Sequence, residues 1–72
     1  MQTITITTEF IKLQDLMKLA DIVGSGGEAK VLIQDGQVLV DGEPCLQRGR
    51  KIKPGTIVTF QNKNYSVAYA DS

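Results

Sequence analysis

The sequence predicts an α+β domain in which two packed helices lie against one small, mostly antiparallel sheet, in the order β-αα-ββ-ββ. Three observations lead to this prediction. Apolar residues recur at helical spacing between residues 13 and 33. Segments of strand character stand before and after that stretch, and glycine or proline turn signals separate the later ones. With 72 residues the chain has room for one domain, which we expect to span residues 1–72.

The first element is expected to be a strand. The segment from Gln2 to Thr7 alternates isoleucine with threonine. Both residues are β-branched, and alternation of apolar with polar side chains is typical of a half-buried strand. The pattern therefore predicts a strand from Gln2 to Thr7.

A first helix is expected from about Lys12 to Ile22. Apolar positions recur along it with the spacing of an amphipathic helix. They are Leu13, Leu16, Met17 and Ala20, with Val23 one turn further on. Gly24 is expected to close this helix, because glycine is the commonest residue just past a helix end.

A second helix is expected to begin sharply at Ser25. Ser25 and Glu28 stand three residues apart, as in a capping box: the serine oxygen accepts from the Glu28 backbone N–H, and the glutamate can reach back. Its apolar face consists of Ala29, Leu32 and Ile33. Gly36 is a suitable stop. Only two or three residues join the two helices, so we expect them to pack as a tight pair.

The rest of the chain is expected to form two hairpins. Val38–Val40 and Glu43–Leu46 flank Asp41-Gly42, which is a signal for a two-residue turn. Pro54-Gly55 marks another turn, since proline presets φ and glycine tolerates a positive φ. The last two strands are expected at Thr56–Phe60 and Tyr65–Tyr69, joined over Asn62-Lys63-Asn64.

Three further side chains carry structural expectations. Tyr65 and Tyr69 share one face of the last strand, and we expect core or half-buried packing for both rather than base-stacking platforms. Cys45 lies in a hairpin strand and is expected to be a small apolar filler. It is the only cysteine, which fits a reducing cytosol and excludes an internal disulfide.

The N-terminal segment lacks both a basic start and a long apolar stretch. We therefore expect neither a signal peptide nor a membrane span, and interpret the chain as a complete cytoplasmic protein.

Catalysis has little support in the sequence. Histidine is absent, which removes the commonest general base near neutral pH. No Cys-His or Ser-His pair can form, the carboxylates are scattered, and no metal-ligand spacing occurs. We expect a non-enzymatic protein without a cofactor, a metal or a small-molecule substrate.

The net charge is zero, but the charges are distributed unevenly. Residues 1–47 hold three lysines and seven acidic residues, a net charge of −4. Residues 48–63 hold five basic residues and no acidic one, a net charge of +5. A dipolar protein of this kind can bind a polyanion with one face and stay soluble through the other.

The basic run Arg48-Gly49-Arg50-Lys51 is the first candidate site. A charged run is often only a solvated loop, but arginine's planar fork matches a phosphate and Gly49 leaves room for the backbone to approach a ligand. Lys12 stands at a helix start, where a cation opposes the helix dipole. Lys30 can extend the same positive surface. Two further lysines are peripheral candidates: Lys18 and Lys53.

The glycine-rich turn Gly24-Ser25-Gly26-Gly27 is the second candidate. It can be a simple helix–helix corner, or its free N–H groups can meet a phosphate oxygen with the help of the helix dipole. A capping Ser25 uses part of those donors, and Glu28 repels an anion. The turn is not a nucleotide-binding P-loop, because no Gly-Lys-Ser/Thr follows it.

From Lys12 to Val58 the chain resembles the S-four-type RNA-binding domain, also called the αL motif. Lys12-Leu13 matches that family's basic opening of helix one, and Ser25 matches the serine that opens helix two. Three later runs also match: Ala29-Lys30-Val31-Leu32-Ile33, Gly36-Gln37-Val38 and Pro54-Gly55. The short chain is most similar to small stand-alone bacterial members. Asp41-Gly42 stands for the family's Asn-Gly, Gln14 for its Asp, and Thr56 for the Asp that follows Pro-Gly.

The resemblance implies binding to structured RNA, with ribosomal RNA and ribosome association as expectations. Separately, we expect the protein to be a monomer. The resemblance places the contact on the helix pair and the adjacent loop. Gly26 replaces the arginine that follows the serine in the family, which removes one phosphate contact. The resemblance therefore shifts the contact toward Lys30 and the 48–51 run, and implies modest affinity led by shape.

Two other functions stay open at this point. A protein-binding adaptor could use the same dipolar surface against an acidic partner. A ubiquitin-like sulfur carrier has a similar length and a similar hairpin turn, but it needs a terminal Gly-Gly. This chain ends in Tyr69-Ala70-Asp71-Ser72, which disfavours that alternative.

Overall fold

The computed structural model describes residues 1–70 and confirms the predicted α+β class. Asp71 and Ser72 lie outside the described residues. They are the last two residues of the predicted 1–72 domain. They also belong to the C-terminal sequence that disfavours a sulfur carrier. The elements in chain order are β1 (Gln2–Ile6), β2 (Ile11–Lys12), α1 (Leu13–Leu19), α2 (Gly26–Gln34), β3 (Val38–Val40), β4 (Glu43–Pro44), β5 (Lys51–Ile52), β6 (Ile57–Phe60) and β7 (Lys63–Tyr69).

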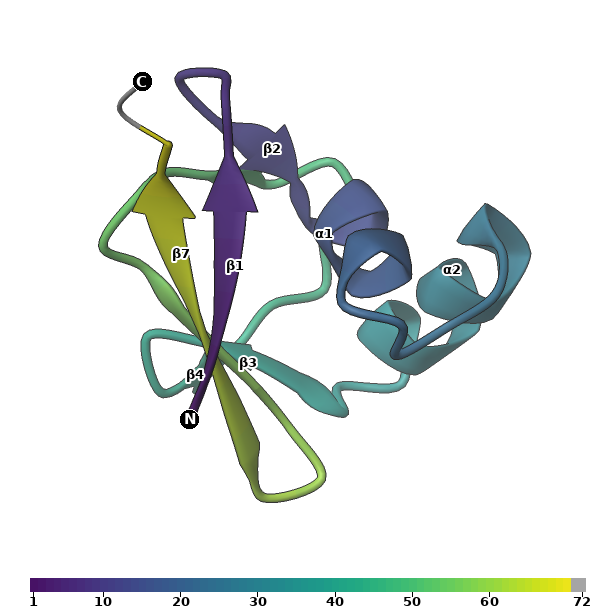
Figure 1. Cartoon of the computed structure of the whole chain (residues 1–72). Helices are drawn as coiled ribbons and strands as arrows, with labels where there is room; N and C mark the ends of the chain where they lie inside the picture. Colours follow the sequence, from purple (N-terminus) through teal and green to yellow (C-terminus); the bar gives the residue numbers. More distant parts are fainter. Residues whose placement is uncertain (71–72) are drawn as a thin grey trace.

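Five of the strands form one mixed sheet in the order β1-β7-β6-β3-β4. Its pairs are antiparallel except β1 with β7, which run parallel with Ile4 opposite Val67. The two helices lie together on one side of this sheet (Figure 1). The expected mostly antiparallel sheet under a helix pair is thus confirmed.

A second, two-stranded sheet was not predicted. β2 and β5 pair antiparallel, with Ile11 opposite Ile52 and Lys12 opposite Lys51. Each strand is only two residues long, which is too short to show the alternation of apolar and polar residues that predicts a strand. This ribbon joins the chain before α1 to the end of the basic run.

The core lies between the helix pair and the inner face of the main sheet. In β1, Ile4 and Ile6 are buried while Thr3 and Thr5 are exposed, as a period of two requires. The largest side chains that are almost fully buried are Leu13, Leu16, Met17, Ile33, Ile52, Val38 and Val58. Because α1 and β5 both contribute to this core, the start of α1 is fixed against the rest of the domain.

Helix α1 ends earlier than predicted. It stops at Leu19 rather than Ile22, and the reversal is at Asp21 (φ 61°) rather than Gly24. The N–H of Ile22 donates to the Met17 carbonyl at 2.9 Å, and the N–H of Asp21 donates to the Lys18 carbonyl at 3.1 Å. This is a Schellman motif with aspartate in the left-handed position, which Asp tolerates better than most residues. The prediction placed the helix end too late because the apolar pattern of the helix continues at Ile22 and Val23.

Helix α2 follows the prediction closely. Ser25 is its N-cap, and its hydroxyl accepts from the Glu28 N–H at 3.3 Å. At the other end Gly36 adopts φ 76°, and its N–H donates to the Ile33 carbonyl at 3.1 Å. The N–H of Gln37 donates to the Leu32 carbonyl at 3.2 Å, which completes a second Schellman motif.

The first hairpin turn is confirmed, and the second is shifted. Asp41 and Gly42 both have positive φ, as a two-residue type I′ turn requires, although β4 stops at Pro44 rather than Leu46. The β6–β7 turn is made by Gln61 and Asn62 (φ 50° and 65°), so Lys63 and Asn64 belong to β7 instead of the loop. Two successive left-handed residues close the hairpin earlier than the expected three-residue connection. The Pro54-Gly55 turn is present, with Gly55 at φ 94°.

Tyr65, Tyr69 and Cys45 divide between the core and the surface. Tyr65 is buried, as expected. Tyr69 is 54% exposed, so the prediction of core or half-buried packing is wrong for this residue. It shares the inner face of β7 but stands at the strand end, beyond the apolar core. Cys45 is buried, and its thiol donates to the Gln47 carbonyl at 3.6 Å, in agreement with its expected role as a filler.

Among the described residues, no helix has the length and apolar character needed to cross a membrane.

Candidate nucleic-acid interface

The start of helix α1 is capped by the basic run. The N–H of Leu13 donates to the Arg50 carbonyl at 2.9 Å, and the N–H of Gln14 donates to the Arg48 carbonyl at 3.0 Å. Lys12 occupies the N-cap position with extended backbone and no side-chain cap. Two of the first N–H groups of a helix, which lack partners inside it, are thereby satisfied by the loop. The loop and the helix start therefore form one unit.

The β2–β5 ribbon brings two more cations to the same place. Lys12 and Lys51 are direct cross-strand partners, a position in which like charges repel. The Lys51 Nζ lies over the ring of Phe10, 5.0 Å from its centroid. We call the four exposed cations gathered here the basic cluster: Lys12, Arg48, Arg50 and Lys51.

Within residues 1–70, no salt bridge joins an acidic side chain to the basic cluster. The salt bridge found in that range joins Lys18 to Asp15 at 3.2 Å and involves none of the four cations. The loop that carries the two arginines lies at the N-terminus of α1, which is the positive end of the helix dipole. Such an arrangement lowers stability in the free protein and favours an anion at the surface.

The two peripheral lysines differ in their surroundings. Lys18 lies in the last turn of α1 and is engaged by Asp15 three residues earlier. Lys53 is exposed and directly follows β5, two residues beyond Lys51. Lys53 can therefore extend the basic cluster, whereas Lys18 is already paired.

The other half of the predicted surface lies elsewhere. Helix α2 lies on the far side of α1 from β2 (Figure 1), and within residues 1–70 no hydrogen bond or ion pair joins residues 25–30 to residues 48–51. Ser25 caps the helix, Lys30 is exposed, and Gly26 has open space where a side chain would stand. Gly27 faces the Ser25 hydroxyl. The structure thus brings Lys12 and the 48–51 run together and leaves Ser25, Gly26, Gly27 and Lys30 as a separate patch.

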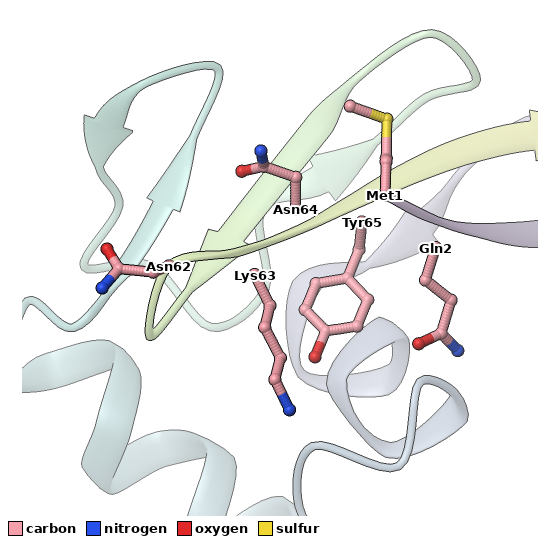
Figure 2. Close-up of a pocket in the computed structure, with 6 residues that line it drawn as sticks. All are labelled: Met1, Gln2, Asn62, Lys63, Asn64 and Tyr65. Atoms are coloured by element: carbon pink, nitrogen blue, oxygen red, sulfur yellow. The ribbon is translucent and has the colours of Figure 1, made fainter.

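A shallow hollow of about 490 Å³ lies where β1 begins and β6 turns into β7. Its lining residues are Met1, Gln2, Asn62, Lys63, Asn64 and Tyr65. Figure 2 shows the side chains of Gln2, Lys63 and Tyr65 extending from the strands to the same side. The hollow contains none of the predicted site residues. Over residues 1–70, no group of three or more His, Cys, Asp or Glu side chains is placed to hold a metal ion.

Comparison with known proteins assigns this architecture to a family. The family model described as "S4 domain" matches residues 4–68, nearly the whole chain. The chain belongs to the S4 domain family. The family resemblance inferred from the helix pair and the 36–42 and 54–55 turns is thereby confirmed.

Two curated relatives of this S4 domain are similar over about four fifths of both chains. One is the "Probable ribosome maturation protein RlbA" of Bacillus subtilis, 45% identical over 58 residues, covering 81% of this chain and 82% of the relative. The other is the "Putative RNA-binding protein YbcJ" of Escherichia coli, 39% identical over 57 residues, covering 79% and 81%.

A solved structure has the same fold as this S4 domain. It is the solution structure of Escherichia coli YbcJ, described as revealing an αL motif involved in RNA binding. It superposes with a TM-score of 0.72 at 35% identity, covering 94% of this chain and 87% of YbcJ. A small sheet under two helices is therefore common to both chains.

Two features of the candidate interface could not be found from the sequence. Phe10 was not singled out, because a lone aromatic residue before a two-residue strand matches no motif. The backbone of Leu13 and Gln14 was missed because a contact with residues some 35 positions away leaves no local signal. The unexplained cation at Lys12 was the one available hint, since it opposes the dipole of the helix that it precedes.

Proposed function

We propose that this S4 domain is a non-enzymatic RNA-binding protein that holds structured RNA through the basic cluster. The observation that carries the proposal is the convergence of Lys12, Arg48, Arg50 and Lys51 at the start of α1, where none of the four is in a salt bridge within residues 1–70. Basic side chains neutralise phosphates and release counterions, which is the main source of affinity for a nucleic-acid backbone. Phosphate contacts of this kind fix the position of the RNA without reading its sequence.

The start of α2 is proposed as a secondary contact. Lys30 and the open first turn at Gly26 and Gly27 can approach a further phosphate of the same RNA, while Ser25 keeps the helix end in place. Lys53 extends the main cluster, whereas Lys18 is paired with Asp15 and lies outside the proposed contact. The basic cluster and the start of α2 are two separate patches. A folded RNA can contact both through its shape more readily than an extended single strand can.

The cellular setting is also part of the proposal. We propose that the domain acts as a cytoplasmic monomer, and that its structured RNA partner is ribosomal. The names of the relatives, a probable ribosome maturation protein and a putative RNA-binding protein, support this direction.

The site assignment is tested with two double variants that remove equal charge. Arg48→Ala/Arg50→Ala removes two cluster cations, whereas Lys18→Ala/Lys63→Ala removes two cations outside it. We expect the first variant to bind a folded ribosomal RNA fragment at least tenfold more weakly, and the second to stay within about threefold of the wild type. Both should keep the wild-type melting temperature within a few degrees. Equal affinities of the two variants would contradict the assignment to the cluster.

A further inference from the structure

Phe10 occupies a position that core packing does not explain. Its ring is half-buried, yet it belongs neither to the core nor to the partly buried residues packed against the core. By contrast, Tyr65 is part of the core and Phe60 packs against it. The ammonium group of Lys51 lies over the Phe10 ring, 5.0 Å from its centroid. The ring therefore lies beside the basic cluster.

We infer that the Phe10 ring is a stacking platform for one unpaired base of the bound RNA. This inference rests on the proposed function and narrows it to RNA with an unpaired nucleotide beside a helical segment. The face of any base can stack on an aromatic ring, so the contact does not depend on sequence. In folded RNA, unpaired bases in loops and bulges are the ones that can be turned out to make such a contact.

The surroundings of Phe10 match a whole nucleotide. Phe10 directly precedes β2, and the β2–β5 pairing places Lys12 and Lys51 opposite each other beside it. A nucleotide has its phosphate and its base on one sugar, so a ring next to two unpaired cations can hold both parts. The four cluster cations then position the backbone while Phe10 receives the base.

Lys51 is expected to have different partners in the free protein and in the RNA complex. In the free protein its ammonium group lies over the ring, and at an exposed site such a cation–π contact is weak. A charge-assisted hydrogen bond from the same group to a phosphate oxygen is stronger. A bound phosphate therefore draws Lys51 away from Phe10 and leaves the ring open to a base.

The test compares two RNAs and three proteins. The RNAs are a stem–loop with unpaired bases and a fully paired duplex with the same number of phosphates. The proteins are the wild type, Phe10→Leu and Phe10→Tyr. We expect Phe10→Leu to bind the stem–loop about 5- to 150-fold more weakly, the range that loss of one stacked base gives. The affinity of Phe10→Leu for the duplex should change by less than about twofold. Phe10→Tyr, which keeps an aromatic ring, should bind the stem–loop with an affinity close to that of the wild type.

Other results separate this inference from the proposed function. Equal losses on both RNAs, or no loss on either, would overturn the stacking role while leaving RNA binding by the cluster in place. Failure of the wild-type protein to bind either RNA would overturn both. Melting temperatures of the three proteins show whether leucine has only loosened the fold, in which case both RNAs are affected alike.

A second measurement uses the wild-type protein and does not depend on a variant. A 5-bromouridine is placed at each loop position of the stem–loop in turn, and the complexes are irradiated. We expect one position to crosslink to the peptide that contains Phe10, as mass spectrometry would show. Crosslinks only to peptides that lack Phe10 would overturn the inference.

Discussion

The backbone N–H of Gln14 donates to the carbonyl of Arg48 at 3.0 Å, so helix α1 begins on the loop that carries the arginines. The relationship has two consequences. The helix gains a cap that its own side chains do not provide, and the loop gains a fixed position although its side chains are exposed. A preformed surface loses less conformational entropy on binding than a mobile loop would.

Replacing Gln14 with proline should therefore weaken RNA binding. Proline lacks the donor for the Arg48 carbonyl, and its fixed φ is close to the helical value. Loss of one hydrogen bond of about 0.5–1.5 kcal/mol corresponds to roughly 3- to 10-fold weaker binding if the bond holds the loop in its binding conformation. Fluorescence anisotropy with labelled RNA measures the change. Gln14→Ala keeps the N–H and is the control, and indistinguishable proline and alanine variants would disprove the coupling.

Replacing Lys12 with glutamate should raise stability and lower affinity. The change puts a favourable charge at a helix start and turns the Lys12–Lys51 repulsion into attraction. Together these effects stabilise by about 0.5–1.5 kcal/mol at low salt. For a domain of this size, that raises the melting temperature by roughly 2–10 °C. A calorimetric scan measures the rise, which should shrink in high salt. An unchanged melting temperature would mean that Lys12 and Lys51 do not repel each other measurably in the wild type.

Gly26 can be used to test the secondary patch. A side chain there has open space, and the backbone φ is not in the left-handed region. Gly26→Arg should restore the family's phosphate contact, strengthen binding by up to about fivefold, and steepen the salt slope by about 0.7–0.9. Gly26→Gln controls for size without charge. If both variants bind like the wild type, the start of α2 does not contact the RNA.

Gly36 should be sensitive to substitution because its φ of 76° closes α2. Gly36→Ala is expected to lower the free energy of unfolding by about 1–2 kcal/mol, the cost of a left-handed conformation for a residue with a Cβ. Gly26→Ala, at the other end of the same helix, should be neutral or slightly stabilising. Urea denaturation of both variants measures the difference, and a loss at Gly26 equal to that at Gly36 would argue against this interpretation.

Features encoded locally could be predicted from the sequence. The Ser25 cap, the Gly36 stop and the Asp41-Gly42 turn each depend on a few adjacent residues, and all three are present. The end of α1 was misplaced because Ile22 and Val23 continue the apolar pattern, although the chain has already reversed at Asp21. The last hairpin was misplaced because Gln61-Asn62 is a less familiar left-handed pair than Asn-Gly.

Contacts distant in sequence could not be predicted. Nothing in the local pattern shows that β2 pairs with β5 or that β1 pairs in parallel with β7. Long-range contacts also explain why the two halves of the predicted surface lie apart. Long-range backbone pairing joins the start of α1 to the 48–51 run, whereas α2 lies on the far side of α1 although it is closer to Lys12 in sequence.

The most direct test of the central claim is the salt dependence of RNA affinity for the wild type and for Arg48→Ala/Arg50→Ala. Three to five phosphate contacts predict a slope of log affinity against log salt of roughly −2 to −4.5. Removal of two contacts should make that slope shallower by about 1.4–1.8, while Lys18→Ala/Lys63→Ala should leave it nearly unchanged. A wild-type slope near zero, or the same slope in the arginine variant, would contradict binding through the basic cluster.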